Sequence, residues 1–211
     1  MPLPPGASLI QTGGTTAVGR LVIQAARARG VRTISIIRDR PDGAALDAAK
    51  AALTALGADC VLSEAEAGVR GGRAGRPAGP LPPPGIPPPC LGLDCVGGGA
   101  GMAAARALAP GGTLVVYGGL GRAPLALPAG PLIFNDLRVR GFWLSGPAAS
   151  TSAAGPAARA ARGATLARAV DLLQRGVLGT PVERVPLERW GDALAALRAG
   201  GRAKKQVLVL P

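Results

Sequence analysis

The chain has 211 residues, enough to bury the core of one domain, and a formal net charge of +12 from 24 lysines and arginines against 12 acidic residues. It contains no histidine and three cysteines, which excludes zinc sites of familiar spacing and any Cys-His or Ser-His catalytic pair. Aromatic residues make up 2% of the chain and the arginines are dispersed, so base-stacking surfaces that bind nucleic acid are disfavoured.

The first predicted elements are a strand, a glycine-rich turn and a helix. Residues 7–11 predict a strand, and residues 13–19, with the sequence GGTTAVG, predict a sharp turn. Apolar residues then recur at helical spacing from Val18, and Gly30 ends the helix. The N-terminus of such a helix can hold a pyrophosphate, because its N–H groups are free and its dipole is positive there. The turn lacks the usual G-x-G-x-x-G spacing, so its weight comes from the order of the elements around it.

Residues 31–37 predict the second strand, and Arg38, Asp39 and Arg40 follow at its end. In a dinucleotide-binding βαβ unit this position lies beside the adenosine ribose and selects between NAD and NADP. The two arginines favour the 2′-phosphate of NADP, because a guanidinium can hold a phosphate through two hydrogen bonds. Asp39 argues for NAD, whose free 2′-hydroxyl commonly binds an acidic residue at this place. We therefore favour NADP as the cofactor. The alternative is that these three charged residues form a solvated loop before Pro41 and contact no cofactor.

The next region predicts one more helix and strand and then loses its pattern. Residues 44–56 predict an alanine-rich helix, and residues 60–62 predict a short strand. Residues 68–89 are mostly Gly, Pro and Arg, and their prolines exclude regular structure. We predict a disordered or polyproline-like insertion here, and favour a tolerated loop expansion over a ligand for SH3-type domains.

Three further strands are predicted, over residues 91–96, 113–116 and 137–144. Glycines follow the first two, at residues 97–99 and 118–119. Ligands of open α/β sheets lie across the carboxyl ends of the strands, where glycines let a ligand approach the backbone. Ordinary turns between strands and helices would explain these glycines equally well.

These motifs resemble the mitochondrial trans-2-enoyl-CoA reductases, also called enoyl-acyl-carrier-protein reductases, of the medium-chain dehydrogenase/reductase superfamily. RDR at the second strand together with FWLS is fairly specific within the superfamily, whereas YGG and VGG are shared more widely. The match covers most of residues 6–147 and about 174–211. The matching motifs are ASLIQ before TTAVG, TISIIRDR, DCVGG, VVYGG, LIFNDL, RGFWLS and the C-terminal KKQVLVL.

The resemblance implies an α/β fold, with an NADP-binding Rossmann domain built on a doubly wound parallel sheet over residues 6–175. Within it, residues 68–89 would be the disordered insertion and residues 148–163 an Ala/Gly loop. Residues 176–211 would be a C-terminal remnant of a GroES-like substrate domain. The family begins with this substrate domain, which carries its catalytic tyrosine, and nothing similar precedes Met1. We therefore expect a truncated or degenerate copy that is inactive by itself, and we assign no catalytic residue.

The activity implied by the resemblance is hydride transfer from NADPH to the 2,3 double bond of an enoyl thioester of CoA or acyl-carrier protein. It also implies a zinc-free homodimer that works in mitochondrial fatty-acid synthesis. The mitochondrial location rests on the resemblance alone, since we see no transit peptide and no stretch apolar enough to span a membrane. By position, the cofactor-binding residues would be Thr15, Thr16, Ala17, Val18, Arg38, Asp39, Arg40, Tyr117, Gly118, Gly119, Leu120, Phe142, Trp143, Leu144, Ser145 and Lys205.

Three alternatives stay open at this point. A zinc-free quinone reductase would share the fold and the YGG turn, although RDR and FWLS argue against it. A non-catalytic NADP-binding fragment would keep the cofactor site without turnover. A basic nucleic-acid-associated protein is a remote alternative, and it would bind with a steep dependence on salt.

Overall fold

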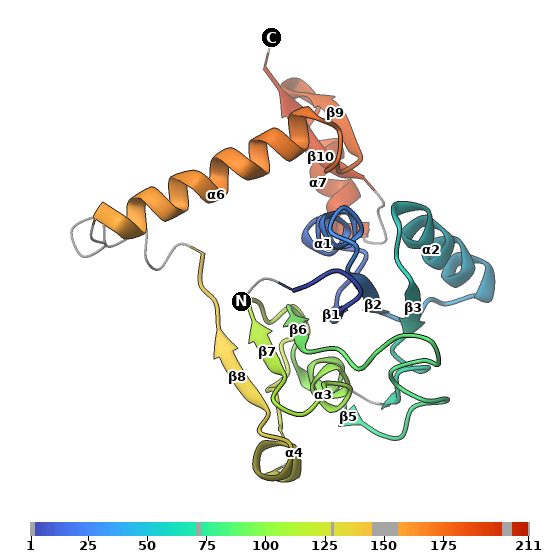
Figure 1. Ribbon diagram of the computed structural model, residues 1–211. Helices are drawn as coiled ribbons and strands as arrows, with labels where there is room; N and C mark the ends of the chain where they lie inside the picture. The colour runs from blue at the N-terminus through green and yellow to red at the C-terminus, as the bar shows by residue number, and fades with distance from the viewer. Residues whose placement is uncertain (1–2, 71–72, 128, 145–155, 200–203, 211) are drawn as a thin grey trace.

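The computed structural model describes residues 3–70, 73–127, 129–144, 156–199 and 204–210 (Figure 1). Its main body is a six-stranded sheet with the order β3-β2-β1-β6-β7-β8, in which each strand is parallel to its neighbours. The order of the strands reverses between β1 and β6, which is the place where open α/β sheets form a ligand crevice. The strands are β1 (Ser8–Thr12), β2 (Arg32–Ile37), β3 (Cys60–Ser63), β6 (Leu91–Asp94), β7 (Thr113–Val116) and β8 (Arg138–Gly141).

Helices cover both faces of this sheet. The longer helices beside it are α1 (Ala17–Arg27), α2 (Gly43–Leu56) and α3 (Gly98–Arg106), and α4 (Ala129–Phe134) precedes β8. Figure 1 shows α1 and α2 on one face of the sheet and α3 on the other. The α/β fold with a doubly wound parallel sheet, predicted from the sequence, is confirmed.

The core follows from the alternation of side chains along β2. Ile34 and Ile36 pack with the alanines of α3, whereas Ile37 packs with Ile23 of α1 and Leu53 of α2. Successive side chains of a strand point to opposite faces, so a β-branched run fills the core on both sides of a covered parallel sheet. The small side chains of α3 let that helix lie close to the sheet.

The proline-rich insertion over residues 68–89, for which disorder is predicted, is irregular but packed in its described residues. Its first part forms a small antiparallel hairpin of two strands, β4 and β5. Val69 is buried in the main core, and Ile86 packs against it. The hydroxyl of Ser8 donates a hydrogen bond to the carbonyl of Pro87 at 2.5 Å. A few apolar residues and backbone carbonyls anchor the segment although its prolines prevent a longer strand or helix. The hairpin strands are β4 (Val69–Arg70) and β5 (Arg73–Ala74).

The Ala/Gly loop predicted over residues 148–163 is wrong in its second half. Residues 145–155 lie outside the described residues, and α6 (Pro156–Gln174) begins directly after them. Proline suits the first position of a helix because its fixed φ is already helical and its missing N–H needs no acceptor there. The alanines and arginines that follow are strong helix formers.

The C-terminal residues form a second, smaller unit. Its strands β9 (Val182–Pro186) and β10 (Lys205–Val209) pair in parallel with each other and are joined by η1 (Leu187–Arg189) and α7 (Trp190–Ala199). Figure 1 shows this unit beside α1. Gln24 of α1 connects the two parts, because its side-chain amide exchanges two hydrogen bonds of 2.8 Å with the backbone of Gly179. The domain boundary near residue 175 stays a prediction.

None of the helices within the described ranges combines the length and the apolar character needed to cross a membrane.

Candidate functional site

A cavity of about 320 Å³ lies at the carboxyl ends of the central strands. Its walls come from the turns after β1, β6 and β7, which contribute lining residues within 13–16, 96–100 and 120–123. Arg38 lines it from the end of β2, and Glu64 lines it from the end of β3. The cavity therefore occupies the point at which the strand order reverses, where open α/β sheets bind their ligands.

The turn after β1 brings the N-terminus of α1 to this cavity. The Thr16 hydroxyl caps the helix by accepting a hydrogen bond of 3.0 Å from the Gly19 N–H. A Cβ atom at Gly19 would lie 2.6 Å from the carbonyl oxygen of Gly13, so only glycine allows this close packing. Within the described chain, the N–H groups of Ala17 and Val18 have no acceptor. These N–H groups and the positive end of the helix dipole make a site for an anion such as a phosphate.

Of the four residues predicted in this turn, Thr15 and Thr16 line the cavity. Ala17 and Val18 are the first residues of α1, and the side chain of Val18 is half exposed. Their contribution to an anion site would come from the backbone rather than from their side chains.

The three charged residues after β2 point to different places. Arg38 is exposed and lines the cavity. The carboxylate of Asp39 accepts a hydrogen bond of 3.1 Å from the Ala65 N–H, which ties it to the turn after β3. Arg40 is half-buried and is not among the residues that line the cavity. The structure thus brings one of the two predicted phosphate-binding arginines to the cavity.

The turn after β7 packs against the turn after β6. Leu120 lines the cavity, and its N–H donates to the Cys95 carbonyl at 2.9 Å. A Cβ atom at Gly118 would lie 3.1 Å from the same carbonyl oxygen, so a larger residue would separate the two turns. Burial, together with the neighbouring thiol of Cys95 and carboxylate of Asp94, raises the pKa of Tyr117. The phenol of Tyr117 is therefore protonated at neutral pH. Gly119, two residues further on, is exposed.

Sequence reasoning did not single out the buried pair that holds the turn after β6. The Thr12 hydroxyl donates a hydrogen bond of 2.6 Å to Asp94 Oδ1 and accepts one of 3.0 Å from the Cys95 N–H. Asp94 Oδ1 also accepts from the N–H groups of Val96 at 3.0 Å and Gly97 at 3.1 Å. A carboxylate at the last position of a buried strand, three residues before a glycine run, is the signal that could have identified this pair.

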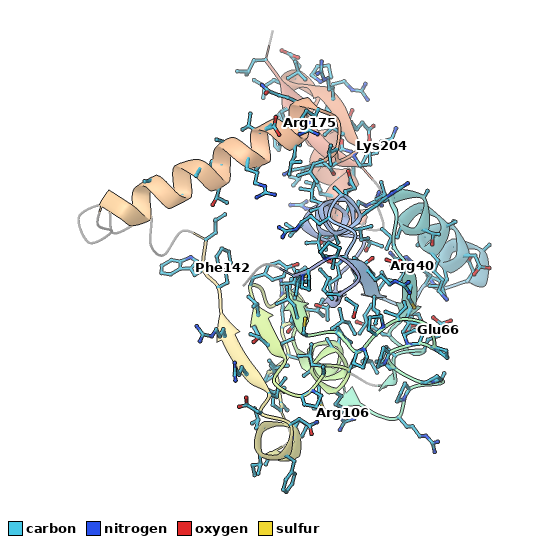
Figure 2. All side chains as sticks on the ribbon, in the orientation of Figure 1. Arg40, Glu66, Arg106, Phe142, Arg175 and Lys204 are labelled. Atoms are coloured by element: carbon cyan, nitrogen blue, oxygen red, sulfur yellow. The ribbon has the colours of Figure 1, made fainter. Side chains whose placement is uncertain are left out.

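Residues 117–119 and the described cofactor residues predicted after β8 and in β10 do not line the cavity. Phe142, Trp143 and Leu144 follow β8 and are mostly exposed. Figure 2 shows Phe142 near the β8 edge of the sheet and Arg40 toward the opposite edge. Lys205 begins β10 in the C-terminal unit, and Ser145 lies outside the described residues. Their roles stay predictions.

The family of the chain is decided by a match that includes the turns after β6 and β7. Residues 91–208 match the family model described as zinc-binding dehydrogenase. The chain belongs to the zinc-binding dehydrogenase family. The resemblance inferred from the sequence motifs is confirmed by the individual relatives.

Two relatives of this chain carry the same name. The chain is 38% identical over 206 residues to the mitochondrial enoyl-[acyl-carrier-protein] reductase of Arabidopsis thaliana, which covers 96% of this chain and 50% of the relative. It is 38% identical over 209 residues to the Homo sapiens protein of that name, and this match covers 99% of this chain and 52% of the relative. The chain thus spans about half the length of the curated relatives it matches.

Two solved structures are also similar to this chain. A mutant form of enoyl thioester reductase from Candida tropicalis superposes with a TM-score of 0.77 at 28% identity, covering 99% of this chain and 56% of that one. The Etr1p/NADP/crotonyl-CoA complex gives a TM-score of 0.74 at 27% identity, again covering 99% and 56%.

The family name implies zinc, and the residues available here do not fit that metal. In the described part of the chain, no group of three or more Cys, His, Asp or Glu side chains is placed to hold a metal ion. Cys60 is on β3, Cys90 is exposed before β6, and Cys95 is buried after β6. Protein zinc sites normally take three or four such ligands, with imidazole or thiolate prominent among them.

Proposed function

We propose that this dehydrogenase chain is the cofactor-binding half of an NADPH-dependent reductase that acts on trans-2-enoyl thioesters of CoA or acyl-carrier protein. The observation that carries the proposal is the cavity at the strand reversal, which the N-terminus of α1 and the Arg38 side chain both reach. The names of the relatives support the substrate class, mitochondrial fatty-acid synthesis and a mitochondrial location. Because those relatives are about twice as long, the whole activity belongs to this proposal.

The residues of the cavity can be given roles in holding NADPH. The N–H groups at the start of α1 would hold the pyrophosphate, and the Arg38 guanidinium would hold the 2′-phosphate. Leu120 and the glycine turns would border the rest of the cofactor, where the absence of side chains lets a flat ring approach. The bound cofactor supplies the hydride, and the protein supplies position and a polar surrounding.

The remaining predicted contacts are kept as part of the proposal. Asp39 and Arg40 would surround the 2′-phosphate, and residues 117–119 would lie beside the cofactor. Residues 142–145 and Lys205 would reach it from other segments of the chain.

The proposal also includes a homodimer. β8 is an edge strand of the sheet, and all four of its residues are exposed. Unpaired N–H and C=O groups along such an edge are a template for pairing with a second copy.

Titration of the purified 211-residue chain with NADPH and NADH, followed by nicotinamide fluorescence, tests the cofactor assignment. We expect tighter binding of NADPH, and we expect Arg38→Ala to weaken NADPH by about tenfold or more, because a charged hydrogen bond contributes roughly 1.5–3 kcal/mol. Arg29→Ala is the matched control, since it removes the same charge from an exposed residue beyond the C-terminus of α1 that does not line the cavity.

The same titration can overturn the proposal. A chain that is folded by circular dichroism and binds neither nucleotide would not be the cofactor half of a reductase. Equal losses in the two arginine variants would contradict the special place given to Arg38.

A further inference from the structure

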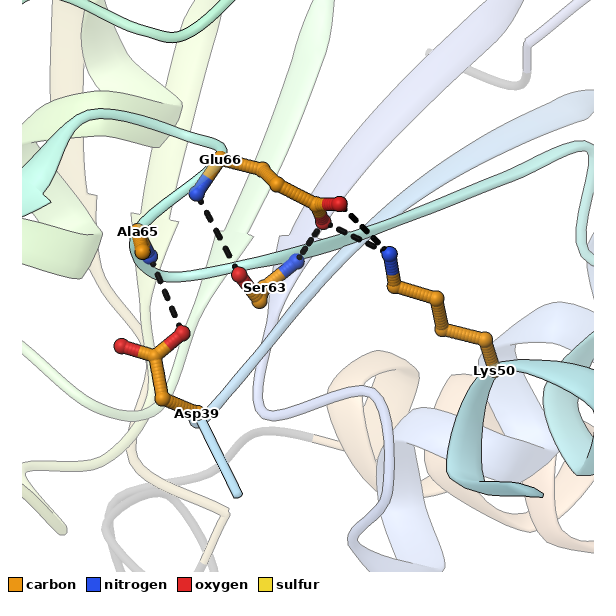
Figure 3. Close-up of polar contacts among 5 residues, drawn as sticks. All are labelled: Asp39, Lys50, Ser63, Ala65 and Glu66. Atoms are coloured by element: carbon orange, nitrogen blue, oxygen red, sulfur yellow. Dashed lines mark hydrogen bonds and ion pairs between the residues drawn. The ribbon is translucent and has the colours of Figure 1, made fainter. Parts of the chain in front are cut away.

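The turn that follows β3 is fixed by contacts from two other elements (Figure 3). Lys50 of α2 donates to both carboxylate oxygens of Glu66, at 2.7 and 2.8 Å. The same carboxylate accepts from the Ser63 N–H at 2.7 Å, and the Ser63 hydroxyl accepts from the Glu66 N–H at 3.2 Å. Asp39, which follows β2, accepts from the Ala65 N–H at 3.1 Å. The residues on either side of Glu64 are therefore held in place.

Glu64 is the residue of this turn whose side chain is presented to the cavity. Its backbone N–H donates to the Ile37 carbonyl at 2.8 Å, which continues the pairing of β3 with β2. Glu64 lines the cavity, and its carboxylate makes no hydrogen bond or ion pair with any residue the structure describes. Burial and the neighbouring Asp39 carboxylate raise its pKa, and the Arg38 guanidinium opposes them.

Arg38 is the partner of opposite charge on the same cavity wall. Its guanidinium also makes no hydrogen bond or ion pair within the described ranges, so no guanidinium nitrogen lies within 4 Å of a Glu64 carboxylate oxygen. The two charges therefore share the cavity without pairing. A ligand group that contacts Arg38 therefore lies in the electrostatic potential of both Arg38 and Glu64.

The proposed function places the 2′-phosphate of NADPH at this end of the cavity, and the present inference rests on it. We propose that Glu64 is a specificity-determining residue whose carboxylate opposes the 2′-phosphate and reduces the preference for NADPH over NADH that Arg38 creates. The acidic residue that faces the adenosine end is then Glu64, because the carboxylate of Asp39 is engaged with the backbone of the turn.

The sign of the effect follows from electrostatics. A phosphate and a carboxylate repel one another across a half-buried cavity, where screening by water is incomplete. The ribose of NADH carries a neutral hydroxyl at the same position, so its binding changes little when the carboxylate is removed. Glu64→Gln keeps the size of the side chain and removes its charge, which isolates this interaction.

The test is a titration of the full chain, as wild type, Glu64→Gln and Glu64→Ala, with NADPH, NADH and the fragment 2′,5′-ADP. We expect the dissociation constants of NADPH and 2′,5′-ADP to fall by about three- to tenfold in both variants, and that of NADH to change by less than about twofold. The gain should shrink at high salt, as an electrostatic effect must. Glu188→Gln is the control, since it removes a carboxylate from an exposed position on η1.

Three other outcomes would contradict the proposed role of Glu64, and the binding data distinguish them. Unchanged or weaker NADPH binding in both Glu64 variants, with NADPH bound by the wild type, would overturn the role of Glu64 and leave the proposed function intact. Weaker binding of NADH would mean that Glu64 binds the ribose rather than opposing the phosphate. If the wild type binds neither NADPH nor 2′,5′-ADP, both proposals fail.

Discussion

Gly19 is the residue on which the shape of the first turn depends. It lies on the side of α1 that faces the turn after β1, and its backbone is in contact with that turn. The distances from a Cβ atom at this position would be 2.6 Å to the Gly13 oxygen and 2.8 Å to the Gly14 Cα, and both of these are backbone atoms that cannot move aside alone.

We expect Gly19→Ala to lower the free energy of unfolding by about 1–3 kcal/mol, because the methyl group forces the helix away from the turn. The same variant should weaken NADPH binding, since the N-terminus of α1 would move from the phosphate site. Urea denaturation measures the first effect and fluorescence titration the second. Gly43→Ala is the control, because a Cβ atom at Gly43 meets nothing within 4 Å. Equal stability of the two variants would contradict this packing.

The candidate site was only partly predictable from residues taken singly. Thr15, Thr16 and Arg38 could be found because a strand, a turn and a second strand fix their place in a βαβ unit. Asp39 follows Arg38 directly but turns to the neighbouring loop, because side chains of adjacent residues in extended chain point in different directions. Glu64 has no motif around it, so only the folded pairing of β2 with β3 reveals that it faces the cavity.

Among the elements, strands were easier to predict than the irregular segments. The apolar runs of β1, β2, β6 and β7 exceed what a surface segment would carry, so their position in a covered sheet is evident from the sequence. In residues 68–89, by contrast, the anchors are isolated apolar residues between prolines, and nothing local marks them as buried. The start of α6 is not evident from the sequence for a different reason, because a mixture of alanine and glycine is also typical of a loop.

The packed insertion leads to a prediction at the scale of this element. Val69 is 8% exposed and belongs to the same core as Ile34 and Ile36. We expect Val69→Ala to lower the free energy of unfolding by about 1–3 kcal/mol, because it removes buried methyl groups and leaves a cavity. Val170→Ala, on the exposed side of α6, should change stability by less than about 0.5 kcal/mol. Two variants of equal stability would show that the insertion is not part of the core.

At the scale of the whole molecule, the β8 edge of the sheet carries an exposed apolar patch. Large apolar side chains gather on α4 and on the segments that flank β8, and Phe134 is 82% and Trp143 71% exposed. A patch of this kind is uncommon on a protein that works as a monomer. A second copy that pairs its own β8 with this strand would satisfy the backbone groups of the edge and cover the patch.

The direction of the hydrogen bonds along β8 allows this pairing to be tested separately from the sheet itself. The N–H groups of Arg138 and Phe142 donate toward β7, to the carbonyls of Gly112 at 2.9 Å and Val116 at 2.8 Å. Because alternate N–H groups of a strand point to opposite sides, the N–H of Val139 faces outward from the edge. Proline at position 139 would remove that donor and leave the bonds to β7 in place.

We therefore expect the wild type to sediment as a dimer in analytical ultracentrifugation and Val139→Pro to sediment as a monomer with a similar circular dichroism spectrum. Val139→Ala keeps the N–H and should stay dimeric, which separates the backbone pairing from the loss of an apolar side chain. The dimer should dissociate on dilution without losing NADPH binding, because Val139 lies away from the residues that line the cavity. A wild type that is monomeric at micromolar concentration, or a proline variant that is still dimeric, would show that β8 does not join two copies.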